Sequence, residues 1–131
     1  MIYLDANFFI ILHFDQSEKG EKARKILQTI VNGKQAVTST LTMDEVMWVI
    51  TKNKKGEVLR TVIENIYGTP NLTIKEVGIT IPLEALAFIE KNNLKPRDAF
   101  HAAIMKVLGV EEIVSDDSDF DRVEHIRRIK L

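Results

Sequence analysis

The chain contains no cysteine, so neither a disulfide framework nor a thiolate metal site is available to it. A structural zinc ion would have to rely on His13, His101 and His125, whose spacing fits no metal-binding pattern. We therefore expect these three histidines to take core or surface roles. The absence of cysteine also favours the cytoplasm as the compartment of the protein.

Long apolar runs are also missing. No run approaches the roughly 20 residues that a membrane-spanning helix needs. The first residues, MIYLDANFFIILHF, are apolar, but they lack a basic leader and are interrupted by Asp5, Asn7 and His13, unlike a signal peptide. We expect no association with a membrane.

An excess of positive charge is absent as well, since 18 basic and 19 acidic residues leave a formal net charge of −1. Proteins that mainly coat nucleic acid usually carry a strong basic excess, so the charge argues against that class. A nuclease remains compatible, because carboxylates gathered for a divalent metal lower the net charge, while the metal reverses the local field that phosphate meets.

What is present is the composition of an ordinary globular domain, with 45% hydrophobic and 28% charged residues in a chain of 131. We find no internal repeat, linker or low-complexity segment. Residues 1–131 are therefore predicted to form a single domain around one core.

Short apolar runs alternate with amphipathic segments along the chain. The runs predict strands over residues 1–4, 36–39, 72–77 and 112–115, and an edge strand over 126–131. The amphipathic segments predict helices over residues 8–14, 17–31, 42–50, 58–66, 81–92 and 96–108. This alternation predicts an α/β fold in three layers, α/β/α, with a central, mostly parallel sheet.

The third predicted helix has two features of its own. Thr42 opens it, with Glu45 at the third position after it, as in a capping box. Its Met47 and Trp48, like Phe100 further along the chain, lie at helical spacing among apolar residues and are expected in the core.

Acidic residues follow two of the predicted strands directly. Asp5 comes after the first strand, and the acidic segment 116–121 comes after the fourth. Ligands of parallel α/β sheets bind beyond the carboxyl ends of the strands, so we expect both at that edge.

Acidic residues occur in four separate motifs, which are LDAN with Asp5, MDEV with Glu45, PRDA with Asp98, and SDDSDF with Asp117 and Asp119. In this order and context the motifs resemble those of PIN domains, most closely the VapC-type toxins of bacterial and archaeal toxin–antitoxin pairs. The resemblance spans essentially the whole chain and implies the PIN fold.

The resemblance also implies the site. It makes Asp5, Glu45, Asp98 and Asp117 both catalytic and metal-binding, adds Asp119 as a metal-binding carboxylate, and gives Asn7 and Ser115 a supporting polar role. Asp44 and Asp116 lie beside two of these residues and are left out, because the family register points to their neighbours. Of these two choices, the one between Asp44 and Glu45 is the more open.

A site made of carboxylates suits Mg²⁺ or Mn²⁺, because these ions take hard oxygen ligands and leave room for water and phosphate. One or two such ions can activate water for in-line attack on phosphorus. Together with this chemistry, the resemblance implies a metal-dependent endoribonuclease. The resemblance further implies an RNA substrate, a cognate antitoxin protein and a homodimer, although a free-standing nuclease is the alternative to a toxin.

A basic cluster follows the predicted Glu45 helix and has two interpretations. It could guide an RNA backbone, or it could be a solvated turn. Its members are Lys52, Lys54, Lys55 and Arg60.

Each carboxylate also has a purely structural interpretation. Asp5 could be a turn residue, Glu45 a capping partner, and Asp98 an anion in the first turn of a helix. The run from Asp117 also imitates the start of an EF-hand loop, but arginines stand where that loop needs glycine and glutamate. It is the ordered combination of motifs that favours a metal site.

Other protein classes fit less well. A haloacid-dehalogenase-like phosphatase needs a second aspartate where Asn7 stands. A response-regulator receiver needs an adjacent N-terminal acidic pair and a phosphorylatable mid-chain aspartate. The alternative from another class is a non-catalytic PIN-like module that binds RNA or protein, and the intact set of carboxylates weighs against it.

Overall fold

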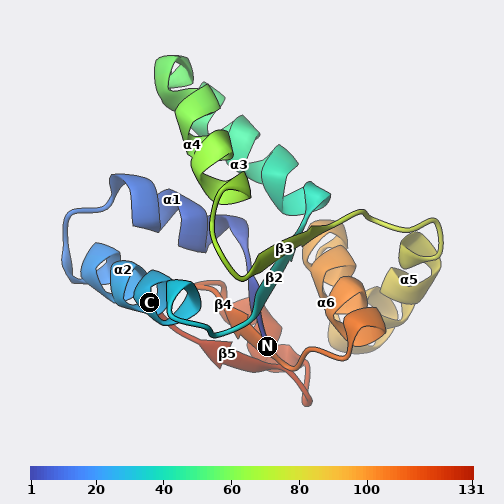
Figure 1. The fold of residues 1–131 in the computed structure, drawn as a ribbon. Helices are drawn as coiled ribbons and strands as arrows, with labels where there is room; N and C mark the ends of the chain where they lie inside the picture. The colour runs from blue at the N-terminus through green and yellow to red at the C-terminus, as the bar shows by residue number, and fades with distance from the viewer.

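Five short strands form the central sheet of the computed structural model, which describes residues 1–131 (Figure 1). The strands are β1 (Ile2–Leu4), β2 (Ala36–Ser39), β3 (Leu72–Lys75), β4 (Glu112–Val114) and β5 (Arg127–Ile129). Their spatial order is β3-β2-β1-β4-β5, and every neighbouring pair is parallel. The predicted strands are confirmed, including the edge position of the last one.

Burial of the strands follows their place in the sheet. Every residue of β1 and β2 is buried, whereas β3 and β5 at the two edges keep partly exposed residues. Continuous apolar strands are expected where helices cover a parallel sheet on both faces. Successive side chains of β1 point to opposite faces, so Tyr3 enters one core while Ile2 and Leu4 enter the other.

The helices are α1 (Ala6–Phe14), α2 (Glu18–Val31), α3 (Thr40–Lys52), α4 (Leu59–Tyr67), α5 (Ile81–Asn92) and α6 (Pro96–Leu108). Two short 3₁₀ helices, η1 (Gly56–Val58) and η2 (Ser118–Arg122), complete the chain. The predicted helices are thus confirmed. None of them combines the length and the apolar composition that crossing a membrane would require.

Local sequence explains several helix ends. Pro82 and Pro96 lie in the first turns of α5 and α6, where their missing amide hydrogen is harmless. Asn93 and Gly109 end the same helices in the left-handed region, at φ values of 54° and 69°. These two helices pack against each other beside one face of the sheet (Figure 1).

Helices cover both faces of the sheet, as Figure 1 shows. The first core lies under α5 and α6 and includes Tyr3, Ile113 and Phe120. The second lies under α1 to α4 and includes Leu4 and Val114. The predicted α/β/α arrangement is therefore confirmed.

The start of α3 differs from the prediction. Ser39 is the N-cap, and its Oγ accepts a hydrogen bond from the amide of Thr42 at 3.4 Å. Thr42 therefore lies inside the helix and Glu45 lies in its second turn, so the predicted capping box is wrong. The buried hydroxyl of Ser39 at the end of β2 begins the helix earlier than the apolar periodicity indicated.

The predicted core positions of Met47 and Trp48 are also wrong. Their side chains are 40% and 55% exposed, because the core-facing side of α3 is formed instead by Met43, Val46 and Ile50. The ammonium of Lys52 lies 4.6 Å from the centroid of the Trp48 ring. Phe100, by contrast, is partly buried against the first core, as expected.

Candidate metal and active site

The carboxyl ends of β1 and β4 are where the acidic motifs meet. β1 lies between β2 and β4, and Leu4 pairs in register with Val114. The chain leaves β1 toward one side of the sheet and later returns on the other side, which makes this a topological switch point, where α/β sheets bind ligands. Asp5 follows β1, and the loop of Asp117 follows β4.

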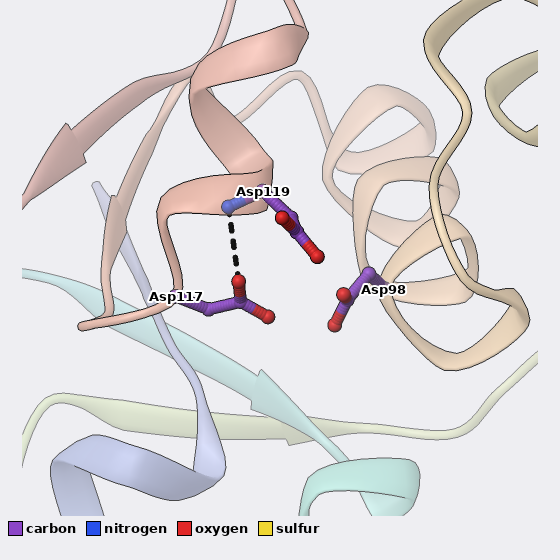
Figure 2. A group of neighbouring side chains, drawn as sticks. All are labelled: Asp98, Asp117 and Asp119. Carbon is purple, nitrogen blue, oxygen red and sulfur yellow. Dashed lines mark hydrogen bonds between the residues drawn. The ribbon is translucent and has the colours of Figure 1, made fainter.

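Three carboxylates gather at this edge (Figure 2). Asp98 comes from the first turn of α6, while Asp117 and Asp119 come from the loop that opens η2. One carboxylate oxygen from each lies within 4.8 Å of the others, and the three side chains point toward one another. The structure thus brings together residues separated by about 20 positions in the sequence.

The acidic loop is shaped by its own side chains. The Ser115 hydroxyl accepts a hydrogen bond from the Asp117 amide at 3.0 Å, and Asp117 Oδ1 accepts one from the Asp119 amide at 2.9 Å (Figure 2). Short polar side chains commonly stabilise turns by accepting an amide two residues ahead. The SDDSDF spacing therefore directs both carboxylates toward α6.

The electrostatics of this cluster favour a cation. The pKa of Asp98 is raised to about 7, first by burial and then by the charge of Asp117, its hydrogen bond with Asp117 and the charge of Asp119. Opposing them, His101 lowers this pKa. Carboxylates this close resist simultaneous ionisation unless a positive charge joins them.

Asp5 lies deeper, with its side chain buried at the N-cap of α1, where Oδ1 accepts a hydrogen bond from the Phe8 amide at 3.2 Å. The pKa of Asp5 is raised to about 6, mainly by burial and also by the charge of Glu45. The Ser115 hydroxyl, the Phe8 amide and His101 act in the lowering direction. Asp5 and Glu45 lie outside the tight group of three.

Glu45 and its neighbour Asp44 are separated by the geometry of α3. Asp44 is exposed, whereas Glu45 Oε1 is hydrogen-bonded to Nε2 of His101 on α6. The helix thus turns Glu45 inward and Asp44 outward. Asp116, the other residue left out, accepts hydrogen bonds from Lys19 and from the amide of Leu131, and so serves the C-terminal end of the chain.

His101 is the site residue that sequence reasoning missed. The expected core role describes its burial correctly, at 2% exposed, but not its contacts with Glu45 and Tyr3. Its position three residues after Asp98 was the available signal, since residues three apart share a helix face. The other two histidines are as expected, since His13 bonds the Phe9 carbonyl at 2.8 Å and His125 is exposed.

Asn7 and the basic cluster lie apart from the three carboxylates. Asn7 is exposed in the first turn of α1. The basic cluster occupies the far end of the α3–α4 hairpin, which projects from the sheet in Figure 1. There Lys55 lies 4.9 Å from the Phe14 ring centroid, and Arg60 pairs with Glu64 at 3.4 Å.

The donor set fits a hard divalent cation. All donors in the group of three are carboxylate oxygens, the ligands that Mg²⁺ and Mn²⁺ prefer, and no thiolate is present to favour softer metals. Each of the three carboxylates is only partly buried, so solvent reaches the group.

Known proteins resemble this chain in sequence pattern and in fold. The family model described as PIN domain matches residues 2–126. No protein with a curated description matches the sequence.

Solved structures share the fold at low sequence identity. One is the Mycobacterium tuberculosis toxin VapC20, described as cleaving the Sarcin-Ricin loop, with a TM-score of 0.79, 14% identity and 95% of each chain covered. Another is VapBC2 from Rickettsia felis bound to a promoter DNA fragment, with a TM-score of 0.78, 15% identity, and 99% of this chain and 98% of that chain covered. A toxin–antitoxin complex from Klebsiella pneumoniae has a TM-score of 0.72 at 20% identity, over 97% of this chain and 96% of the other.

Proposed function

The chain belongs to the PIN domain family, and from that premise we propose that it is a divalent-metal-dependent endoribonuclease, the toxin of a toxin–antitoxin pair. The observation that carries the proposal is the convergence of Asp98, Asp117 and Asp119 at the carboxyl edge of the sheet. Three mutually repelling carboxylates in a partly exposed position have little structural use, whereas they suit a hard cation.

The site residues have distinct tasks in this proposal. Mg²⁺ or Mn²⁺ is held by Asp98, Asp117 and Asp119. We propose that Asp5 and Glu45 contribute further carboxylates to the same site. The ion, when bound, lowers the pKa of water and neutralises charge on the scissile phosphate. Ser115 holds the loop and lowers the pKa of Asp5, so that Asp5 ionises more readily in its buried place.

RNA is the proposed substrate. The similar VapC20 structure is described as a toxin that cleaves the Sarcin-Ricin loop, which supports RNA as the class of polymer. The exposed Asn7 lies two residues after Asp5, in the first turn of α1, and is proposed to contact the substrate beside Asp5. The basic cluster at the α3–α4 turn is proposed to bind the RNA backbone at a distance from the cut bond, because Lys52 lies about two turns along α3 from Glu45 and the other members follow the end of that helix.

The proposed partners are an antitoxin and a second copy of the chain. Several similar structures are toxin–antitoxin complexes, which supports an antitoxin segment covering the acidic groove. Exposed Ile79, Leu83 and Leu86 around α5 support a homodimer, since apolar side chains at such spacing are usually covered. We propose the cytoplasm as the compartment, since that is where an RNA-cleaving toxin meets its substrate.

The test is RNA cleavage by the purified protein with Mg²⁺ or Mn²⁺, with and without a chelator. We expect cleavage that stops on chelation and leaves 5′-phosphate and 3′-hydroxyl ends, because water and not the ribose 2′-hydroxyl is the nucleophile. Cleavage that survives full chelation, or 2′,3′-cyclic phosphate ends, would contradict the proposal. Binding of RNA without cleavage under every metal condition would favour the non-catalytic module instead.

The homodimer is tested separately by sedimentation. We expect a species of twice the 15.0 kDa chain mass at micromolar concentration. A species of single-chain mass at that concentration would contradict the dimer while leaving the nuclease proposal intact.

A further inference from the structure

A buried chain of hydrogen bonds leads from Glu45 into the middle of the fold. Glu45 bonds His101 Nε2, and His101 Nδ1 lies 2.7 Å from the Tyr3 hydroxyl. The Tyr3 hydroxyl lies 2.9 Å from Ser39 Oγ, which accepts from the Thr42 amide. The chain thus connects α3, α6, β1 and β2, and no buried side-chain polar atom is left without a partner.

The acidic end of this chain limits the direction of its hydrogen bonds. An ionised Glu45 can only accept, so Nε2 of His101 carries the hydrogen of their contact. Tyr3 can then donate to Nδ1 of His101 while it accepts from Ser39, whose Oγ also lies 3.5 Å from Thr42 Oγ1. Burial raises the pKa of Tyr3 to about 12, so the phenol keeps the hydrogen that it donates.

We propose that His101 is a positioning residue for Glu45, with its Nε2–H holding one oxygen of the Glu45 carboxylate and the Tyr3 hydroxyl holding the ring in the tautomer that can do so. The proposal rests on the proposed nuclease function. It goes beyond the acidic motifs, because no carboxylate motif contains Tyr3 or His101.

Two observations favour this role over simple filling of the core. First, the chain of hydrogen bonds ends on Glu45, an acidic side chain whose charge also acts on the pKa of Asp5, and not on a backbone carbonyl. Second, His101 is only 2% exposed and yet contacts side chains with both ring nitrogens, Tyr3 on β1 and Glu45 on α3.

Glutamate has several rotatable bonds, and a long side chain in a partly exposed site loses positional precision unless a neighbour holds it. Holding Oε1 leaves the other Glu45 oxygen for the ion or its water. Groups that hold metal ligands in this way typically contribute 10- to 100-fold to metal affinity or activity.

The experiment compares His101→Gln, whose amide nitrogen can replace Nε2 as a donor, with His101→Leu, which removes the donor. The exposed His125→Gln serves as the matched control. We measure Mn²⁺ affinity of the metal-free protein by calorimetry and kcat and KM on an RNA oligonucleotide. Circular dichroism checks that each variant is folded.

We expect His101→Leu to lose roughly 10- to 100-fold in Mn²⁺ affinity or in kcat, with KM changed less, since the RNA does not touch the buried ring. His101→Gln is expected to recover most of that loss, and His125→Gln to match the wild type. Equal losses in the Gln and Leu variants, or a change below about threefold in both, would overturn the proposal.

Nitrogen-15 NMR of the imidazole tests the same bond without activity. We expect the metal-free wild type to carry a hydrogen on Nε2 of His101, the nitrogen that contacts Glu45. A ring without a hydrogen on Nε2 would overturn the assignment. If His101→Leu does not fold, Tyr3→Phe replaces it, and we expect a loss of the Nε2–H preference together with weaker Mn²⁺ binding; an unchanged spectrum and affinity would overturn the proposal.

Failure of the proposed function looks different. A wild-type protein that neither binds Mn²⁺ nor cleaves RNA, but shows the expected tautomer, contradicts the nuclease and with it the positioning role. A wild type that does both, with no effect of the His101 variants, contradicts the positioning role alone.

Discussion

The two sides of the acidic site differ in how their carboxylates are supported. On the side of β1 and α3, Asp5 and Glu45 accept hydrogen bonds from buried donors, the Phe8 amide and the His101 ring. On the side of α6 and η2, three carboxylates face one another. On that side, Asp117 accepts a hydrogen bond from the Asp119 amide. Asp119 also forms an ion pair with Arg122 at 3.3 Å.

This difference separates what the folded chain provides from what a ligand must provide. Buried polar groups stabilise a fold when each one is paired, and on the first side Asp5 and Glu45 have hydrogen-bond partners without metal. Like charges in contact destabilise it, so the second side stays under repulsion until a cation binds. The fold thus positions Asp5 and Glu45 by hydrogen bonds, whereas the three carboxylates of the second side depend on a bound ion.

The largest expected effect comes from removing a charge on the repelling side. Asp117→Asn should reduce RNA cleavage by roughly 100-fold or more, because metal ions contribute several kcal/mol to such reactions. It should also abolish the rise in melting temperature on adding Mn²⁺, since a ligand stabilises only the state that binds it. Without metal, the melting temperature should stay equal or rise, because one repulsion is removed.

The matched controls for that variant lie on the supported side and on the surface. Asp5→Asn should also abolish cleavage and the metal response, and should leave the metal-free melting temperature equal or raised, because the raised pKa of Asp5 shows that its charge costs stability in the folded state. The exposed Asp44→Asn should change neither property. Cleavage and a metal-induced shift retained in Asp117→Asn would refute the assignment of the site.

A smaller effect is expected from breaking the supported side. Tyr3→Phe removes the hydroxyl between His101 and Ser39, which leaves His101 Nδ1 without a partner and Ser39 Oγ with Thr42 alone. The expected loss is about 1–3 kcal/mol in the free energy of unfolding, measured by urea denaturation. Tyr67→Phe is the control, since Tyr67 is 59% exposed and should lose almost nothing. Equal stability of the two variants would show that the network does not stabilise the fold.

The pH dependence of the metal-free protein should reveal the repulsion. The pKa values of Asp98 and Asp5 are raised from 3.8 to about 7 and about 6, so the folded state binds more protons than the unfolded state in this range. Stability should therefore be greatest near pH 4 and fall as the pH rises through about 7. Groups with lowered pKa, such as Asp121 beside Arg128, act in the opposite direction only below this window.

Melting temperatures from pH 4.5 to 8 test that expectation. Saturating Mn²⁺ should offset the fall, since the cation replaces the protons between the carboxylates. Asp98→Asn should flatten the metal-free curve, because the group with the most strongly raised pKa no longer titrates. A metal-free protein that gains stability between pH 5 and 7 would contradict the proposed repulsion.

The smallest effect is expected at Arg122, which pairs with Asp119 and donates to the Asn93 carbonyl at 2.9 Å. Both contacts are exposed, so Arg122→Gln should lower stability by less than about 1 kcal/mol. Removing a cation beside Asp119 should tighten Mn²⁺ binding by a few fold. Weaker Mn²⁺ binding would mean that Arg122 orders the acidic loop more than it competes with the ion.

The order and type of the helices and strands follow from the sequence alone. The spacing of apolar residues and local end signals such as Pro96 and Gly109 act over a few positions, so they can be read without the fold. The same holds for the shared edge of Asp5 and Asp117, because parallel strands bring their carboxyl ends to one edge. The SDDSDF loop is equally local, since its turns are closed by its own side chains.

Which side chains meet depends on the tertiary structure. The inward turn of Glu45, the outward turn of Asp44 and the exposure of Trp48 depend on how α3 rests on the sheet, which periodicity leaves open because α3 is apolar on several sides. The chain from Tyr3 through His101 to Glu45 joins residues 98 and 56 positions apart. Such contacts depend on the packing of whole elements, and no local pattern encodes them.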